Sequence, residues 1–317
     1  MIVRWSLADL PAVLSELRFG RPLLVASDRW TSLDVPRVGQ WSEIPSHRIE
    51  VPPAADSLLA IGGGSAIDTA KAASAATGLP LVSVPTTYSG SEWTDGFGIR
   101  QPDRRIVGRG RGANLAGIVY DVSLTLDLPL AETVGTSMNA LAHCAEALYV
   151  QGRSDAGDLC ALEGAELIAQ SLPRVVEAPH DVEARTRLLR GARFAGEALA
   201  LAGLGLAHAM AQTLGGIYGL PHGAMNALTL PPALRFNTAL APEAVARFGA
   251  AIGSRNDPAA AVEELARLGN FERLRDYGVR ESDLPGIAVS ITQRPGNEMN
   301  PRPATPAEIE ELLRSIY

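Results

Sequence analysis

Three of the five histidines in this chain lie in apolar, helix-like sequence, where a polar side chain needs a partner. His143 follows Asn139 by one helical turn, so both side chains are expected on one helix face. His208 lies within a strongly apolar segment, and His222 stands between a proline and a glycine at a predicted helix start. Imidazole can bind zinc or iron, and it can donate a proton to an oxygen that gains negative charge. The spacing leaves both kinds of site open, and for each histidine taken alone a core position is the alternative.

A glycine-rich turn indicates where an anion could bind. The turn separates a predicted strand over residues 57–61 from a predicted helix over residues 66–76, and it consists of Gly62, Gly63, Gly64 and Ser65. Glycines let the backbone approach a pyrophosphate, and a helix start directs free N–H groups at it. Asp68 lies in the first turns of the helix, where a carboxylate also suits the helix dipole. Ordinary turn chemistry is the alternative for this motif alone.

A second polar turn follows a predicted strand over residues 81–84. Its side chains with hydroxyl groups are Thr86, Thr87, Tyr88, Ser89 and Ser91. Because the carboxyl ends of parallel strands meet at one edge of a sheet, we expect this turn beside the glycine turn, where open α/β sheets bind ligands. A hydrophilic loop that caps helices is the alternative.

The elements that position these residues divide the chain in two. Further strands are predicted over residues 22–27 and 117–121, with a helix over residues 7–18, so the first part should contain parallel β-α-β units. After Leu128 the pattern becomes helical, with segments over residues 131–150, 155–171, 183–198, 201–215, 222–236, 242–253, 256–268 and 305–316. We therefore expect an α/β domain over residues 1–128 and an all-α domain over residues 129–317.

Composition narrows the class of protein. The 317 residues are 46% hydrophobic and carry a formal net charge of −7, with only 5% aromatic residues, which argues against a nucleic-acid partner. The apolar stretch over residues 198–211 is too short to span a membrane, and no signal sequence is expected at the N-terminus. Two cysteines cannot form a disulfide framework, so a reducing cytoplasm is expected. The expected partner is a small-molecule substrate.

Taken together, the motifs resemble the iron-containing (group III) alcohol dehydrogenase superfamily. The resemblance runs in order over nearly the whole chain. It is carried by Gly62–Lys71, Val84–Glu92, Tyr120-Asp121, Met138–Ala147, His208, Pro221-His222-Gly223 and the ending Asn300-Pro301-Arg302-Pro303. The Thr-Thr-Tyr-Ser-Gly-Ser-Glu turn and Asn139 are similar to the maleylacetate reductase branch.

The resemblance implies a dehydroquinate synthase-like fold, with an NAD(P)H-binding α/β domain, a helical catalytic domain and a cleft between them. It implies that NADH or NADPH lies on the glycine turn, Asp68 and the turn with Thr86, Thr87, Ser89 and Ser91. It also maps the family's metal positions onto Asn139, His143, His208 and His222. Asn139 stands where metal-dependent members have an aspartate, so the Coulomb attraction for zinc or iron is weakened and a metal-free site is favoured. Gln212 stands where many relatives have a further histidine, which removes a titratable group.

The activity implied is the reduction of an unsaturated keto-diacid such as maleylacetate to 3-oxoadipate in the degradation of aromatic compounds. His143, His208, His222 and Asn139 are the expected catalytic residues, and Arg105, Arg109 and Arg111 are candidates to meet substrate carboxylates. The resemblance also implies a homodimer. The alternatives are a metal-dependent alcohol or polyol dehydrogenase of the same superfamily and a non-catalytic nucleotide-binding relative.

Overall fold

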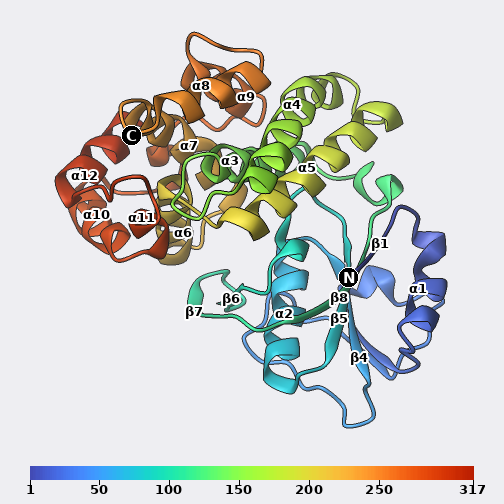
Figure 1. Cartoon of the computed structure of the whole chain (residues 1–317). Coiled ribbons are helices and arrows are strands. Elements are labelled where there is room, and N and C mark those ends of the chain that lie inside the picture. The colour runs from blue at the N-terminus through green and yellow to red at the C-terminus, as the bar shows by residue number, and fades with distance from the viewer. The chain divides into compact units, whose positions relative to one another are not determined.

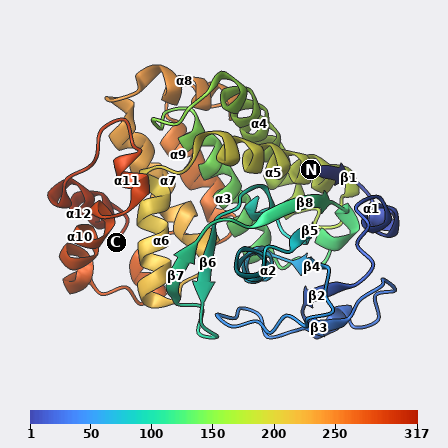
Figure 2. The same ribbon diagram turned by 60° about the horizontal axis from the view of Figure 1, so that its bottom comes forward.

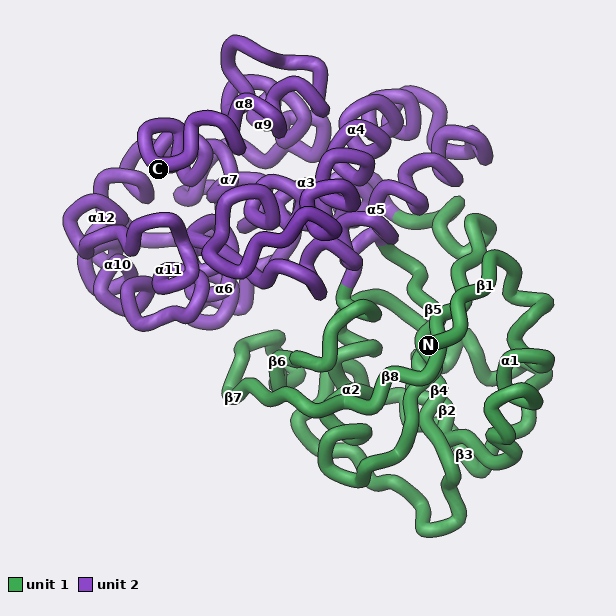
Figure 3. The backbone as a smooth tube through the Cα atoms, viewed as in Figure 1, with its two compact units in different colours: residues 1–87, 91–128 green, residues 88–90, 129–317 purple.

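The computed structural model describes all residues, 1–317, and divides them into two compact units. The first unit comprises residues 1–87 and 91–128, and the second comprises residues 88–90 and 129–317 (Figure 3). The chain therefore changes unit at Leu128, and a three-residue segment of the polar turn belongs to the second unit.

The first unit is built on a parallel sheet of six strands in the order β1-β8-β5-β4-β2-β3. The strands are β1 (Ile2–Arg4), β2 (Pro22–Ala26), β3 (Gly39–Trp41), β4 (Ser57–Gly62), β5 (Pro80–Pro85) and β8 (Asn114–Val119). The strands predicted over 22–27, 57–61, 81–84 and 117–121 are β2, β4, β5 and β8, whereas β1 and β3, three residues each, carry too little pattern to predict. The glycine turn lies beside the end of β5, because Gly62 pairs with Pro85.

Two helices cover the opposite faces of this sheet, α1 (Leu10–Glu16) and α2 (Gly64–Thr77) (Figure 1). Side chains alternate between the faces along each strand. Leu24, Leu59 and Ile61 pack in one core cluster with α1, and their neighbours Val25, Leu58 and Ala60 pack in the other with α2. An antiparallel pair, β6 (Phe97–Arg100) and β7 (Ile106–Gly110), stands apart from the six strands (Figure 2).

The second unit is all-helical. Its helices are α3 (Leu130–Ala147), α4 (Asp155–Glu177), α5 (Val182–Ala202), α6 (Leu206–Tyr218), α7 (His222–Thr238), α8 (Pro242–Ala251), α9 (Pro258–Arg267), α10 (Leu284–Thr292), α11 (Pro295–Glu298) and α12 (Pro306–Ser315). Every predicted helical segment is present, but residues 201–215 do not form one helix. Gly203 has φ +93 and ends α5, and α6 begins at Leu206. Helices α10 and α11 lie where we predicted no helix.

Helix α3 is the central helix of this unit. Nearly all of its side chains from Thr133 to Ala147 are buried, including polar ones. No single helix is long and apolar enough to cross a membrane. Only α5 and α6 taken together pass such a test, and they meet at 102°.

Candidate active site

Three histidine rings meet inside the helical unit. His143 comes from α3, His208 from the first turn of α6 and His222 from the first residue of α7. The rings of His143 and His208 stack with centroids 4.6 Å apart, and those of His208 and His222 are 5.8 Å apart. His143 and His208 are buried, and His222 is half-buried. The structure thus brings together the three histidines that the sequence singles out, and His222 is the most accessible.

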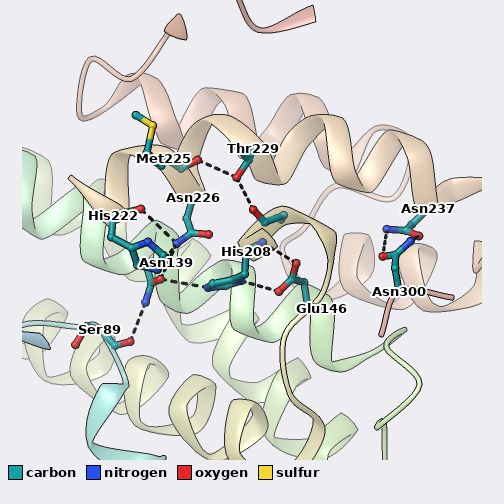
Figure 4. A network of polar contacts seen from close by, with 11 residues as sticks. Ser89, Asn139, Glu146, His208, His222, Met225, Asn226, Thr229, Asn237 and Asn300 are labelled. Atoms are coloured by element: carbon teal, nitrogen blue, oxygen red, sulfur yellow. Dashed lines mark hydrogen bonds and ion pairs between the residues drawn. The ribbon is translucent and has the colours of Figure 1, made fainter. Parts of the chain in front are cut away.

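Asn139 links this cluster to the polar turn. Its Nδ2 donates to the carbonyl oxygen of Ser89 at 2.8 Å. Its Oδ1 accepts from Nδ2 of Asn226 at 2.7 Å and lies 3.3 Å from Nε2 of His208 (Figure 4). Because a carbonyl can only accept, Nδ2 must face Ser89 and Oδ1 must face His208. The amide is therefore held in one orientation.

Glu146 is a member of the cluster that the sequence analysis missed. Its Oε2 lies 2.6 Å from Nδ1 of His208, and its Oε1 accepts from the backbone N–H of the same residue at 3.1 Å. Glu146 is completely buried. One sequence signal was available: a glutamate in the apolar stretch after His143 requires a buried partner. The sequence does not say which partner.

The contacts of His208 fix the orientation of its ring. Nδ1 meets the Glu146 carboxylate at 2.6 Å, and Nε2 faces Oδ1 of Asn139 at 3.3 Å. Both ring nitrogens of His208 are therefore in contact with a polar side chain. Burial lowers the pKa of His143 well below its usual value, and the charges of His208 and His222 lower it further, so His143 is neutral.

Three buried polar atoms of the cluster have no hydrogen-bond partner within the protein: Oγ of Ser89, Nδ1 of His143 and Oδ1 of Asn226. An unpaired buried polar atom is costly in a purely structural site. Several unpaired buried polar atoms close together are typical of a place where a ligand or ordered water completes the hydrogen bonding.

The donor set does not fit a divalent metal ion. No group of three or more His, Cys, Asp or Glu side chains in the chain is arranged to hold one. Asn139 brings no charge, and Nδ2 of Asn226 places an N–H donor 3.1 Å from Nε2 of His222, where a cation would need a free lone pair. Glu146, the carboxylate of the cluster, is occupied by His208.

The second polar turn is shared between the two units. Thr86, Thr87 and Ser91 belong to the α/β unit, whereas residues 88–90 belong to the helical unit. Ser89, which the resemblance assigned to the cofactor, therefore lies beside Asn139 in the histidine cluster.

Side chains of α3 and α5 hold this short segment. The N–H of Tyr88 donates to Oγ1 of Thr136 at 3.2 Å, and the buried guanidinium of Arg185 donates to the Tyr88 hydroxyl at 3.0 Å. Gly90 has φ +72, and a Cβ there would lie 3.1 Å from Cα of Gly196. Only glycine fits this approach to α5 without strain.

The glycine turn has the features of an anion site. Gly63 precedes α2, and no side chain caps the helix start. A Cβ on Gly62 would lie 2.8 Å from Cβ of Ala66, and a Cβ on Gly63 would lie 2.9 Å from Cγ2 of Thr87. The hydroxyl of Thr87 is buried with no partner in the protein. Free N–H groups, an uncapped helix and an unpaired hydroxyl together suit a pyrophosphate.

Asp68 and Ser91 are used within the protein. Oγ of Ser91 donates to Oδ1 of Asp68 at 2.7 Å, and Lys71 lies 3.3 Å from the same carboxylate. The Lys71 ammonium also donates to the carbonyl oxygens of Ser91 at 2.8 Å and Gly96 at 2.6 Å. These bonds fasten the chain after the polar turn to α2. Asp68 and Ser91 therefore shape the turn, and contact with a cofactor remains a prediction for them.

The three arginines proposed for substrate carboxylates lie on and around β7, in the α/β unit. Arg105 pairs with Asp103 at 3.6 Å and Arg111 pairs with Asp95 at 3.3 Å, and both arginines are exposed. Arg109 also has an interaction partner. Exposed pairs of this kind are weak, so they leave the arginines able to exchange partners.

Comparison with known proteins gives one consistent result. Residues 133–317 match the model of the Fe-containing alcohol dehydrogenase family, C-terminal, and residues 52–115 match that of iron-containing alcohol dehydrogenase. The chain is 37% identical over 265 residues to a maleylacetate reductase of Pseudomonas sp. (strain P51), covering 83% of this chain and 74% of that protein. It is 36% identical to maleylacetate reductase 1 of Rhodococcus opacus, with 83% and 73% covered. The crystal structure of maleylacetate reductase from Agrobacterium tumefaciens has a TM-score of 0.87 at 29% identity, with 100% of this chain and 95% of that chain covered.

Proposed function

This chain belongs to the iron-containing alcohol dehydrogenase family, and we propose that it is an NAD(P)H-dependent reductase of the maleylacetate reductase type. Its proposed reaction is the reduction of an unsaturated keto-diacid such as maleylacetate to 3-oxoadipate. The observation that carries this proposal is the meeting of three histidine rings beside the hydrogen-bonded Asn139, in a chain 37% identical to a maleylacetate reductase.

The proposed chemistry needs a donor for a developing oxyanion. Hydride addition to a double bond conjugated with a ketone places negative charge on the ketone oxygen, and a proton must then reach the other carbon. NAD(P)H supplies the hydride when it is bound. His222 is the most accessible of the three rings and His208 lies beside it, with centroids 5.8 Å apart, so these two are the proposed donors. His143 and Asn139 complete the polar surroundings.

The proposed cofactor site is the glycine turn of the α/β unit. Gly62, Gly63, Gly64 and Ser65 would hold the pyrophosphate, with Thr86 and Thr87 beside them. The fit rests on the close approach at Gly62 and Gly63 and on the unpaired hydroxyl of Thr87. Both NADH and NADPH suit this turn, because the pyrophosphate is common to them.

We propose that the reaction proceeds without zinc or iron. The support is the donor set, in which a neutral amide replaces a charged ligand and the one carboxylate is paired with His208. Stoichiometric zinc or iron in protein purified without chelator would overturn this part of the proposal. We further place the protein, as part of the same proposal, in the cytoplasm, as a homodimer, in the degradation of aromatic compounds.

The direct test is a steady-state assay. We expect maleylacetate to cause oxidation of NADH or NADPH, and we expect simple alcohols with NAD⁺ to give none. Turnover of simple alcohols that is abolished by a chelator, without turnover of maleylacetate, would identify a metal-dependent alcohol dehydrogenase instead. Binding of NADH, seen by its fluorescence, without turnover of any substrate would identify a non-catalytic relative.

A further inference from the structure

Glu146 and His208 form a buried pair between α3 and α6. The carboxylate is completely buried and the imidazole is 1% exposed. Both carboxylate oxygens serve the same residue, since Oε2 meets the ring at 2.6 Å and Oε1 meets its backbone N–H at 3.1 Å (Figure 4). Because the Glu146 carboxylate contacts both the ring and the backbone of His208, neither side chain can turn without losing one of these contacts.

A glycine at the start of α6 leaves room for the Glu146 carboxylate beside His208. Gly205 precedes α6, and a Cβ there would lie 3.1 Å from Oε1 of Glu146. Glycine at this position leaves the space that the carboxylate needs. His208 is the third residue of α6, so Glu146 also accepts one of the free N–H groups at the helix start, where a negative charge is favourable.

Glu146 is the one acidic group in contact with His208. Asn139 is neutral, and the other groups that face His208 are His143 from α3 and His222 from α7, which bring no negative charge. Glu146 therefore provides the only carboxylate that can orient the ring. Because both carboxylate oxygens of Glu146 are engaged by His208, Glu146 acts through that residue.

We propose that Glu146 is a positioning residue for the reductase reaction, which fixes the His208 ring with Nε2 directed at Asn139. This inference rests on the proposed function. The Glu146 carboxylate determines which nitrogen of His208 faces the cluster, and Asn139 receives that nitrogen. Removal of the charge frees the ring to turn away from the orientation in which it can serve the substrate.

The test compares Glu146→Gln with Glu146→Asp. In Glu146→Gln, the single amide oxygen can accept from only one of the two His208 N–H groups, and the amide NH₂ group faces the second. We therefore expect kcat for maleylacetate to fall about 100-fold, as for a misplaced catalytic group. KM and the NADH dissociation constant should stay within about twofold, since binding contacts made directly by other residues are kept. In Glu146→Asp the charge remains one methylene further away, and kcat should recover part of the loss.

A matched control separates positioning from helix capping. Asp181 caps α5 in the same unit through Oδ1 and the N–H of Ala184 at 2.9 Å, far along the chain from the histidines. Asp181→Ala removes this cap and should lower the unfolding temperature without lowering kcat. If the kcat of Glu146→Gln falls only as far as its unfolded fraction explains, the proposal is wrong.

A second readout does not depend on turnover. In ¹H–¹⁵N spectra of protein labelled at histidine, the wild type should show the Nδ1–H group of His208, which faces Glu146, protected from exchange. Glu146→Gln should lose this protection while His222→Ala keeps it. Protection that survives in Glu146→Gln would overturn the proposal. Protection lost as expected, in a protein that does not reduce maleylacetate, would support the positioning role and reject the proposed substrate.

Discussion

Replacement of Asn139 by aspartate tests whether the neutral amide keeps a metal ion out of the cluster. Asn139→Asp changes one nitrogen to oxygen at the centre of the site. The Nδ2 that donates to the Ser89 carbonyl at 2.8 Å becomes an oxygen that repels it, and the new carboxylate faces Nε2 of His208. The variant thus loses an internal hydrogen bond and gains the charge that a cation site needs.

The two effects can be weighed separately. A buried carbonyl left without its donor costs about 1–3 kcal/mol, so the variant should be less stable than the wild type by that amount in the presence of a chelator. A metal that binds only the folded protein adds about 2.7 kcal/mol at about 100 times its dissociation constant. Zinc should therefore restore most or all of the lost stability in the variant and leave the wild type unchanged.

The assay is urea unfolding followed by circular dichroism, with chelator and with zinc. The matched control is Asn237→Asp. It makes the same change at a buried asparagine that is bonded to Asn300 at 3.0 Å, away from the imidazoles. That control should lose stability and gain nothing from zinc. If zinc stabilises the wild type as much as Asn139→Asp, the neutral amide does not exclude the metal and the reasoning is refuted.

Three further predictions concern other parts of the chain. Gly63→Ala places a methyl group at 2.9 Å from its neighbour and should weaken NADH binding at least about tenfold, measured by NADH fluorescence, whereas Gly286→Ala, in open space, should not. Arg185→Leu removes a buried donor from the Tyr88 hydroxyl and from the Pro179 carbonyl and should cost about 1–3 kcal/mol in urea unfolding; an unchanged midpoint would contradict this. Hydrogen bonds lower the pKa of the Glu308 carboxyl from 4.5 to about 2. The largest effect comes from the Arg302 guanidinium, and the next from the backbone and hydroxyl of Thr305 at the start of α12. This carboxylate therefore stabilises the fold above about pH 4.5 and loses that contribution as the pH falls towards 2, a slope that Glu308→Gln should lack.

Local sequence was enough to predict the parts of the fold that have strong periodicity. Strands β2, β4 and β5 are buried on both faces and read as short apolar runs, and the glycines after β4 mark the start of α2. The hairpin of β6 and β7 could not be predicted, because none of its residues is fully buried and glycine occupies positions 98, 108 and 110, which interrupts the apolar pattern.

The candidate site was predictable only in part. The histidines could be singled out because polar residues in apolar helices need partners, but their convergence depends on how α3, α6 and α7 pack. Two features followed from tertiary contacts alone. One is the pairing of Glu146 with His208, and the other is the place of Ser89 in the helical unit. In the same way, nothing in the sequence near Asp68 shows that Lys71 and Ser91 occupy its carboxylate.

The most direct test of the account is turnover and metal content measured on one sample. We predict that protein purified without chelator oxidises NADH or NADPH with maleylacetate, holds far less than one zinc or iron per chain, and keeps its full rate after chelation. A rate that rises and falls in proportion to bound zinc or iron would contradict a reaction carried by the hydrogen-bonded histidine cluster.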